Sequence, residues 1–252
     1  MVEDFEFKNT PWKDEFSNAY QDGKIFIQDN LSLELPIYRY TTLENLLHIL
    51  SRSEYNISKR TFFTDGNEQG LYCDHKYTFD LCPVGGDLNY CEAYQKHIAK
   101  QNNEVRQMYI SCWTENENES FLMWKSYASN GIGVRIETNI AQLLNSLHSN
   151  SSKIFCSRVN YHPEGYKDTW FKKVFVKKPE YEQEQEVRIC VCPNRNNRIY
   201  CDRLMLKVNT PFITSVTLSP FLSVLEQKFL LESLNKSYPN LVIKRSLLVE
   251  KC

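Results

Sequence analysis

The chain has 252 residues, and its composition of 42% hydrophobic, 24% charged and 13% aromatic residues is that of an ordinary folded protein. This composition excludes disordered, collagen-like and coiled-coil chains. Thirty basic and 31 acidic residues nearly cancel, so the chain as a whole is not a polycation that coats nucleic acid.

The first 37 residues are acidic, because eight Asp and Glu residues against three Lys residues give a net charge of −5. We expect residues 1–36 to form an acidic leader with short helical pieces that packs on the core. Residues 37–40 are β-prone and form the first strand of the expected core. The pair Thr41-Thr42 supplies a candidate N-cap for a helix whose leucines recur at helical spacing up to Leu50. Residues 55–63 are expected to be extended.

In the middle of the chain, patterns typical of helices and of strands follow one another. Residues 88–101 and 121–127 are expected helices, and Asn130-Gly131 ends the second helix in the manner of a left-handed C-cap. Residues 132–137 alternate apolar and polar side chains, which predicts a half-buried strand. The remaining expected elements here are a strand at 108–113, a helix at 140–147 and a strand at 153–160.

The last third contains an expected hairpin. Residues 187–191 alternate as a strand does, residues 193–197 supply turn chemistry, and residues 198–208 return as the partner strand. A strand at 213–218, a helix at 221–235 and a strand at 241–248 follow. This irregular order predicts one α+β domain over residues 37–252, with mixed or antiparallel sheets and flanking helices.

The nine cysteines are odd in number and lack the short repeated spacing of a disulfide-stapled domain, so we expect most of them to be reduced and buried. Five candidate metal ligands lie within 25 residues, but their spacings do not match those of zinc ligand pairs, and we expect no metal site. These residues are Cys73, His75, Cys82, Cys91 and His97.

No apolar run approaches the roughly 20 residues that cross a bilayer. The first nine residues are acidic and aromatic, whereas a secretory signal is basic and then apolar. We therefore expect a cytoplasmic protein that makes no membrane contact.

One segment is strongly basic. Residues 153–178 carry seven Lys and Arg residues against two acidic ones, a net charge of +5, with six aromatic residues among them. Cations beside aromatic rings suit phosphates and unstacked bases, although a solvated loop with a few buried aromatics explains the same composition. The candidate contacts to nucleic acid or substrate are Lys167, Lys172, Lys173, Lys177 and Lys178.

Polar side chains interrupt three otherwise apolar strands. Arg39 and Ser111 lie within the strands expected at 37–40 and 108–113. Glu184 and Glu186 share one face of the strand that leads into the hairpin, by the period of two. These residues are ordinary polar side chains at strand edges, members of one internal ion-pair network, or parts of a functional site.

Two blocks of sequence carry a family signature. The first consists of residues 110–115 (ISCWTE), 121–128 (FLMWKSYA) and 131–134 (GIGV), and the second is residues 177–188 (KKPEYEQEQEVR). These blocks resemble the DUF2971 domain proteins, a bacterial family of unknown function, and residues 38–40 (YRY) match the beginning of that family. A Phe-Asn-Asp-Pro turn common in the family is replaced by residues 63–68 (FTDGNE).

The order of three parts is also similar to that of the arginine–serine–glutamate ADP-ribosyltransferases. Their motif has an arginine on the first core strand, a serine on a later strand and a Glu-x-Glu strand. The corresponding residues here are Arg39, Ser111 and Glu184-Gln185-Glu186. The resemblance implies an ADP-ribosyltransferase-like fold and NAD as the substrate that supplies ADP-ribose.

The resemblance also implies a role for each residue. Cleavage of the nicotinamide–ribose bond develops positive charge, which Glu186 would stabilise. Arg39 would hold the NAD pyrophosphate in a bidentate fork. Ser111 would orient Glu186 and the nicotinamide ribose, and Glu184 would position the acceptor nucleophile or tune the other carboxylate, Glu186.

Trp124 and Tyr127 lie on one face of their expected helix. Nicotinamide stacking is one role for them, and ordinary core packing is the one that helical spacing favours.

The leading hypothesis from the sequence is an NAD-dependent ADP-ribosyltransferase that modifies a macromolecule as a toxin or antiviral effector. The alternative is a non-catalytic module of a defence or toxin–antitoxin system that binds nucleic acid or protein through residues 153–178. A nuclease ranks last, because no acidic cluster suits magnesium.

Overall fold

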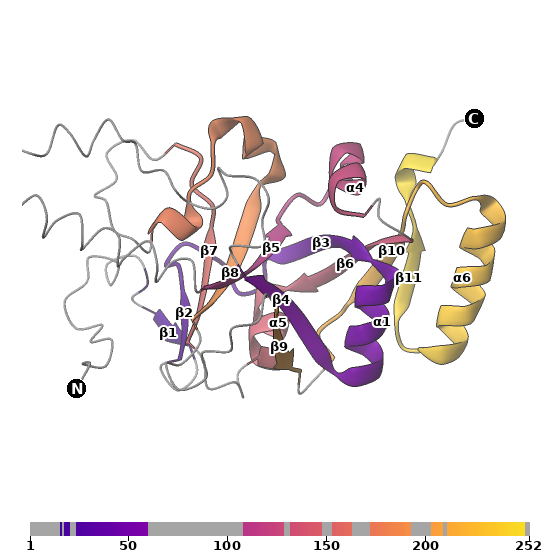
Figure 1. Ribbon diagram of the computed structural model, residues 1–252, viewed down its shortest axis with the longest axis horizontal. Coiled ribbons are helices and arrows are strands. Elements are labelled where there is room, and N and C mark those ends of the chain that lie inside the picture. The colour runs from indigo at the N-terminus through magenta and orange to yellow at the C-terminus, as the bar shows by residue number, and fades with distance from the viewer. Residues whose placement is uncertain are drawn as a thin grey trace, which may run out of the picture.

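The computed structural model describes residues 16, 18–20, 24–59, 108–128, 132–147, 153–162, 172–192, 203–208 and 211–249. Their strands form one 11-stranded mixed sheet, and helices pack on it (Figure 1). The strands are β1 (Asn18–Tyr20), β2 (Ile25–Ile27), β3 (Pro36–Thr42), β4 (Glu54–Lys59), β5 (Tyr109–Thr114), β6 (Gly133–Asn139), β7 (Lys153–Arg158), β8 (Glu186–Cys192), β9 (Arg203–Lys207), β10 (Ser215–Leu218) and β11 (Val242–Arg245). The α-helices are α1 (Leu43–Arg52), α4 (Phe121–Tyr127), α5 (Ile140–Leu147) and α6 (Val224–Ser237), and the 3-10 helices are η4 (Lys172–Phe175), η5 (Pro179–Glu184) and η7 (Leu247–Val249).

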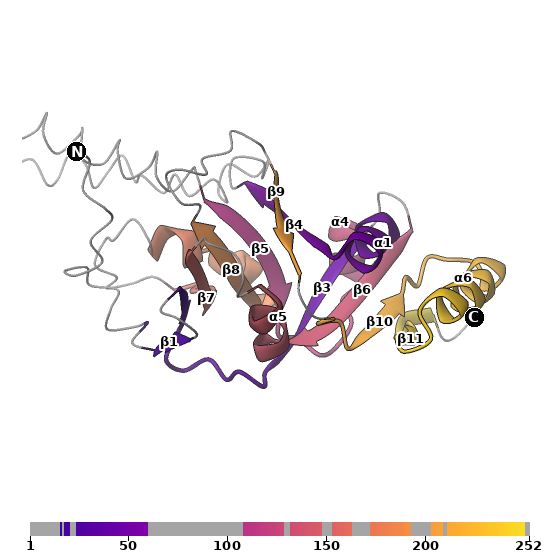
Figure 2. The same cartoon turned by 90° about the horizontal axis from the view of Figure 1, so that it is seen from below.

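The sheet divides beside β5. Strand order is β1-β2-β7-β8-β5-β3-β6-β10-β11, while β4 also pairs with β5 and carries β9. Tyr38 of β3 pairs with Thr114 at one end of β5, and Ser58 of β4 pairs with Ile110 toward the other end. Strands β3 and β4 therefore diverge from β5, and α1 connects their far ends (Figures 1 and 2). We call the space between β3, α1 and β4 the wedge.

The two faces of the sheet are covered differently. One face carries the main core, in which Ile37 and Ile136 of the sheet pack with Leu46 of α1, Leu143 of α5 and Leu230 of α6. On the other face there are two smaller clusters. One is centred on Phe155, Phe175 and Cys190, and the other joins Tyr40 to Trp124 and Ala128.

The structure confirms an α+β protein with a mixed, largely antiparallel sheet. The helix expected at 140–147 forms with those bounds, and the helix expected to run through residues 121–127 forms as α4 but ends at Tyr127, before the expected stop. The strand expected at 132–137 is β6, displaced by one or two residues. The helix expected at 88–101, the stop at Asn130-Gly131 and the turn over residues 63–68 lie outside the described residues. Among the helices that are described, none has the length and apolar character needed to cross a membrane.

Three sequence-based expectations are wrong. The described part of the leader contains strands β1 and β2 rather than helical pieces, and β2 joins the sheet beside β7. The expected hairpin does not form, since β9 pairs with β4. Both edges of β8 are already occupied by β5 and β7, which leaves β9 no place beside it. Glu184 is not on a strand, because it ends η5.

Candidate functional site

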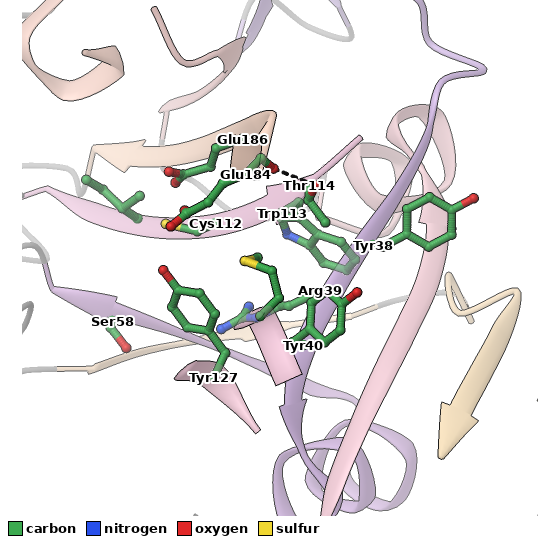
Figure 3. A pocket seen from close by; sticks show the side chains of 12 residues that line it. Tyr38, Arg39, Tyr40, Ser58, Cys112, Trp113, Thr114, Tyr127, Glu184 and Glu186 are labelled. Carbon is green, nitrogen blue, oxygen red and sulfur yellow. Dashed lines mark hydrogen bonds between the residues drawn. The ribbon is translucent and has the colours of Figure 1, made fainter. Parts of the chain in front are cut away.

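A pocket opens between the two smaller clusters, on the face of the sheet that α4 covers (Figure 3). Its volume is about 590 Å³, which includes space open to solvent. The described residues that line it are Tyr38, Arg39, Tyr40, Ser58, Ile110, Cys112, Trp113, Thr114, Met123, Tyr127, Glu184 and Glu186. The structure thus brings Arg39, Glu184, Glu186 and Tyr127 to one cavity, from β3, η5, β8 and α4.

Arg39 is held by two buried side chains, which a third buried side chain supports. Its Nη1 donates a hydrogen bond to Ser111 Oγ at 2.9 Å and another to the Tyr55 hydroxyl. Trp113 Nε1 donates to the same two oxygens, at 2.9 Å to Ser111 and 3.2 Å to Tyr55. Tyr55, Ser111 and Trp113 are each at most 2% exposed, so they form a rigid base beneath the guanidinium. We call these four residues the Arg39 cluster.

The charge of Arg39 has no carboxylate partner in the part of the chain that the structure describes. Other arginines nearby are engaged: Arg158 pairs with Glu115, and Arg135 donates to the carbonyls of Asn116 and Glu117. A half-buried guanidinium whose charge is not neutralised attracts an anion, and its planar fork matches a phosphate or carboxylate. Arg39 is therefore the candidate anion-binding group of the pocket.

The carboxylates opposite Arg39 belong to a buried ion-pair network. Arg188 donates to both carboxylate oxygens of Glu186, from Nε at 2.7 Å and Nη2 at 3.1 Å. Lys177 Nζ lies 2.8 Å from Glu184 Oε2 and 3.4 Å from Glu186 Oε2. The side chain of Glu186 is 3% exposed and that of Glu184 is 11% exposed. We call these four residues the carboxylate network.

A local backbone feature brings the two carboxylates together. Gln185, between η5 and β8, has a left-handed conformation with φ 42° and ψ 55°, which is unusual for a residue other than glycine. Thr114 Oγ1 donates to the Glu184 carbonyl at 2.6 Å, and Glu115 N donates to the Gln185 carbonyl at 3.0 Å. Because of this turn, both carboxylates reach Lys177 although only Glu186 lies on the strand.

Glu186 stays ionised at ordinary pH. Burial is the largest influence on its pKa and raises it, but the charge and hydrogen bonds of Arg188, the charge of Lys177 and a hydrogen bond from Cys112 together outweigh burial. The pKa of Glu186 is therefore lowered to about 2.

This lowered pKa predicts a loss of stability in acid. A carboxylate with a depressed pKa stabilises the fold above its unfolded value of 4.5, and that contribution disappears as the pH falls toward 2. A shift of this size corresponds to about 3 kcal/mol. Urea unfolding at pH 5.5 and pH 2.5 should show a decrease in the free energy of unfolding that is about 2–3 kcal/mol larger for the wild type than for Glu186→Gln. Equal decreases would contradict the assignment.

The two candidate residues of α4, Trp124 and Tyr127, have different positions. Trp124 is fully buried, packs edge-on against Tyr40 with ring centroids 4.9 Å apart, and donates from Nε1 to Glu119 at 2.9 Å. It belongs to the core and does not line the pocket. Tyr127 does line the pocket, and Figure 3 shows its hydroxyl pointing toward Glu184. Burial of this hydroxyl and the negative charge of Glu184 raise the pKa of Tyr127, which keeps the phenol protonated.

Ser111 does not orient Glu186, contrary to the expectation from sequence. In the β5–β8 register Ser111 lies opposite Ile189, and Thr114 lies opposite Glu186. Because successive side chains of a strand alternate between faces, Ser111 and Glu186 project from opposite faces of the sheet. Cys112, the neighbour of Ser111, is on the same face as Glu186, and its side chain hydrogen-bonds the Glu186 carboxylate.

The basic segment is distributed over several environments. Lys177 is 5% exposed and belongs to the carboxylate network, so it is not on an outer basic surface. Lys178 is partly exposed and precedes η5. Lys167 and the side chains of Lys172 and Lys173 lie outside the described residues. Nucleic-acid contact by this segment stays a prediction.

Sequence reasoning missed several residues of the site. Trp113 and Arg188 carried a visible signal, since each lies two residues from a candidate and therefore on the same strand face, beside Ser111 and Glu186 respectively. Tyr55 gave no local signal, because it reaches Ser111 from another strand. Within the described ranges no group of three or more His, Cys, Asp or Glu side chains could hold a metal ion, and the Cys73–His97 window lies outside these ranges.

Comparison with known proteins supports one of the two resemblances. Residues 123–189 match the model of DUF2971, a protein family of unknown function. The match includes Tyr127, Lys177 and both carboxylates of the pocket, but not Arg39 or Ser111. No curated protein matches the chain.

Proposed function

We propose that this chain is an NAD-dependent ADP-ribosyltransferase that modifies a macromolecular acceptor, as a toxin or antiviral defence effector. One observation carries the proposal. Arg39, whose charge has no carboxylate partner among the described residues, lines the same cavity as Glu184 and Glu186. The pocket thus has a cation on one side and two carboxylates on the other. The cation suits a pyrophosphate, and the carboxylates suit a neighbouring bond whose cleavage develops positive charge.

Arg39 binds the pyrophosphate in this proposal. Tyr55 and Ser111 accept from Nη1, and this fixes the guanidinium while its other N–H groups remain to face a phosphate. The rigid base below Arg39 means that little side-chain entropy is lost when the anion binds.

The carboxylate network acts on the ribose. The nicotinamide–ribose bond breaks with its electron pair going to nicotinamide, and the acceptor nucleophile then forms a bond to the same ribose carbon and loses its proton. Glu186 is held ionised and stabilises the positive charge on the ribose, partly offset by Arg188 and Lys177. Glu184, the more exposed carboxylate, positions the acceptor.

Tyr127 supplies an aromatic surface and a hydrogen-bond donor. Its ring lines the cavity and offers a stacking surface for nicotinamide, and its protonated hydroxyl points into the pocket (Figure 3). Trp124 has no such role, because it is buried in the core.

The test is release of nicotinamide from NAD by the purified chain, followed by chromatography, first alone and then with cell extract as a source of acceptor. The proposal expects nicotinamide release and labelling of a macromolecule by NAD that carries a label on its adenine. NAD that remains intact under both conditions would contradict it.

A further inference from the structure

A second pocket adjoins the first and occupies the wedge. The two pockets share Arg39 and Ser58, and the second has a volume of about 500 Å³, again including space open to solvent. Helix α1 contributes Asn45 and His48 to its lining, and β4 contributes Asn56. Asn56 and Ser58 project from the same side of β4, so the pockets follow one another along that strand, with Arg39 where they meet.

The chemistry of this second pocket is cationic and polar. Arg39 and Arg203 line it, and none of its described lining residues is acidic. Ile49 and Ile136 provide an apolar surface beside these polar groups. An apolar surface with a few convergent polar groups is typical of a small-molecule site, and the arginines favour a ligand that carries a phosphate.

Two buried polar atoms of the pocket lack hydrogen-bond partners. Among the described residues three buried side-chain polar atoms are unsatisfied, and two of them, Asn56 Oδ1 and His48 Nε2, belong to residues of this pocket. His48 Nε2 lies 3.3 Å from Glu54 Oε2 and so has a charged neighbour, whereas Asn56 Oδ1 has no partner within the described ranges. A buried acceptor without a donor is unfavourable, and a ligand N–H group would satisfy it.

We propose that the second pocket binds the adenine nucleotide half of the substrate, with the 6-amino group of adenine donating to Asn56 Oδ1. The identification of the ligand rests on the proposed function, since the first pocket takes the nicotinamide ribose and Arg39 the phosphates between the two. An asparagine or glutamine amide is the usual side-chain partner of the amino edge of adenine. The isoleucine surface accommodates the flat purine ring.

The experiment compares AMP with purine riboside 5′-monophosphate, which lacks the 6-amino group, by calorimetric titration. Wild-type protein should bind AMP about tenfold more tightly, as expected for one well-placed hydrogen bond to a base. Asn56→Leu should lose this preference while its affinity for purine riboside 5′-monophosphate stays within about twofold. Asn235→Leu, on the exposed side of α6, is the matched control and should keep the preference.

Equal affinities in the wild type, or a preference that survives in Asn56→Leu, would overturn the proposal. Should Asn56→Leu fail to fold, photo-crosslinking of 8-azido-AMP to the wild type decides: labelling of residues that line the second pocket supports it, and labelling elsewhere overturns it. Neither measurement involves chemistry on NAD. Selective AMP binding without nicotinamide release would support the adenine pocket and contradict the transferase proposal. Nicotinamide release without selective AMP binding would support the transferase and contradict the adenine pocket.

Discussion

Glu186→Gln should retain the affinity of the wild type for NAD and release nicotinamide about 10²–10³-fold more slowly, the size of effect seen when one group that stabilises transition-state charge is removed. The reason is that Glu186 faces the pocket as a carboxylate that stays ionised down to about pH 2, so the substitution removes a full negative charge from the place where the ribose becomes positive. Turnover is measured by chromatography of nicotinamide and affinity by calorimetry.

The control for this variant is Glu182→Gln. Glu182 belongs to η5 but is exposed and pairs with His162 outside the pocket, so the same chemical change there should leave turnover within about twofold of the wild type. Folding of both variants is checked by circular dichroism. A folded Glu186→Gln protein with wild-type turnover would show that the carboxylate is structural and does not take part in the reaction.

Arg188→Met should lower the free energy of unfolding by about 3–5 kcal/mol, the range for removing one partner of a buried ion pair. Arg188 is 2% exposed and donates a hydrogen bond to each of the two Glu186 carboxylate oxygens, while its Nη1 donates to the Val174 carbonyl at 2.7 Å. Its removal leaves Lys177, 3.4 Å away, as the nearest remaining cation of the network. Urea unfolding at pH 7 measures the change.

The double variant Glu186→Gln/Arg188→Met distinguishes a loss of stability caused by the broken ion pair from one caused by lost packing of the Arg188 side chain. Because the variant no longer contains an uncompensated buried carboxylate, it should be more stable than Arg188→Met alone. Arg245→Met on the exposed edge strand β11 is the control and should change stability by less than about 0.5 kcal/mol. An Arg188→Met protein that loses less than about 1 kcal/mol would contradict the network.

Local patterns in the sequence were enough to predict much of the fold. The alternation that predicts β6 and the capped apolar stripe that predicts α1 depend only on nearby residues, and both elements form close to the expected bounds. The pairing of β9 with β4 could not be predicted in the same way. It depends on which edges other strands have already occupied, and residues distant in the sequence decide that.

In the candidate site, too, some features could be predicted from the sequence and others depend on strand pairing. The resemblance to the arginine–serine–glutamate motif implied that Arg39 and Glu186 share one site, and both line the pocket. The register of β5 against β8 puts Ser111 on the other face, and no feature of the Ser111 segment alone reveals that register. The left-handed turn at Gln185 was also hidden, because a Glu-Gln-Glu sequence reads as a continuous strand by its period of two.

The central claim is that Arg39 holds an NAD pyrophosphate, and calorimetric titration of NAD into the wild type and Arg39→Lys tests it most directly. Lysine keeps the charge but cannot donate to Ser111 and Tyr55 while it also forks onto a phosphate. The account predicts that the wild type binds one equivalent of NAD, that Arg39→Lys binds at least about tenfold more weakly, and that Arg245→Lys binds as the wild type does. A wild-type protein that does not bind NAD, or an Arg39→Lys protein with unchanged affinity, would contradict it.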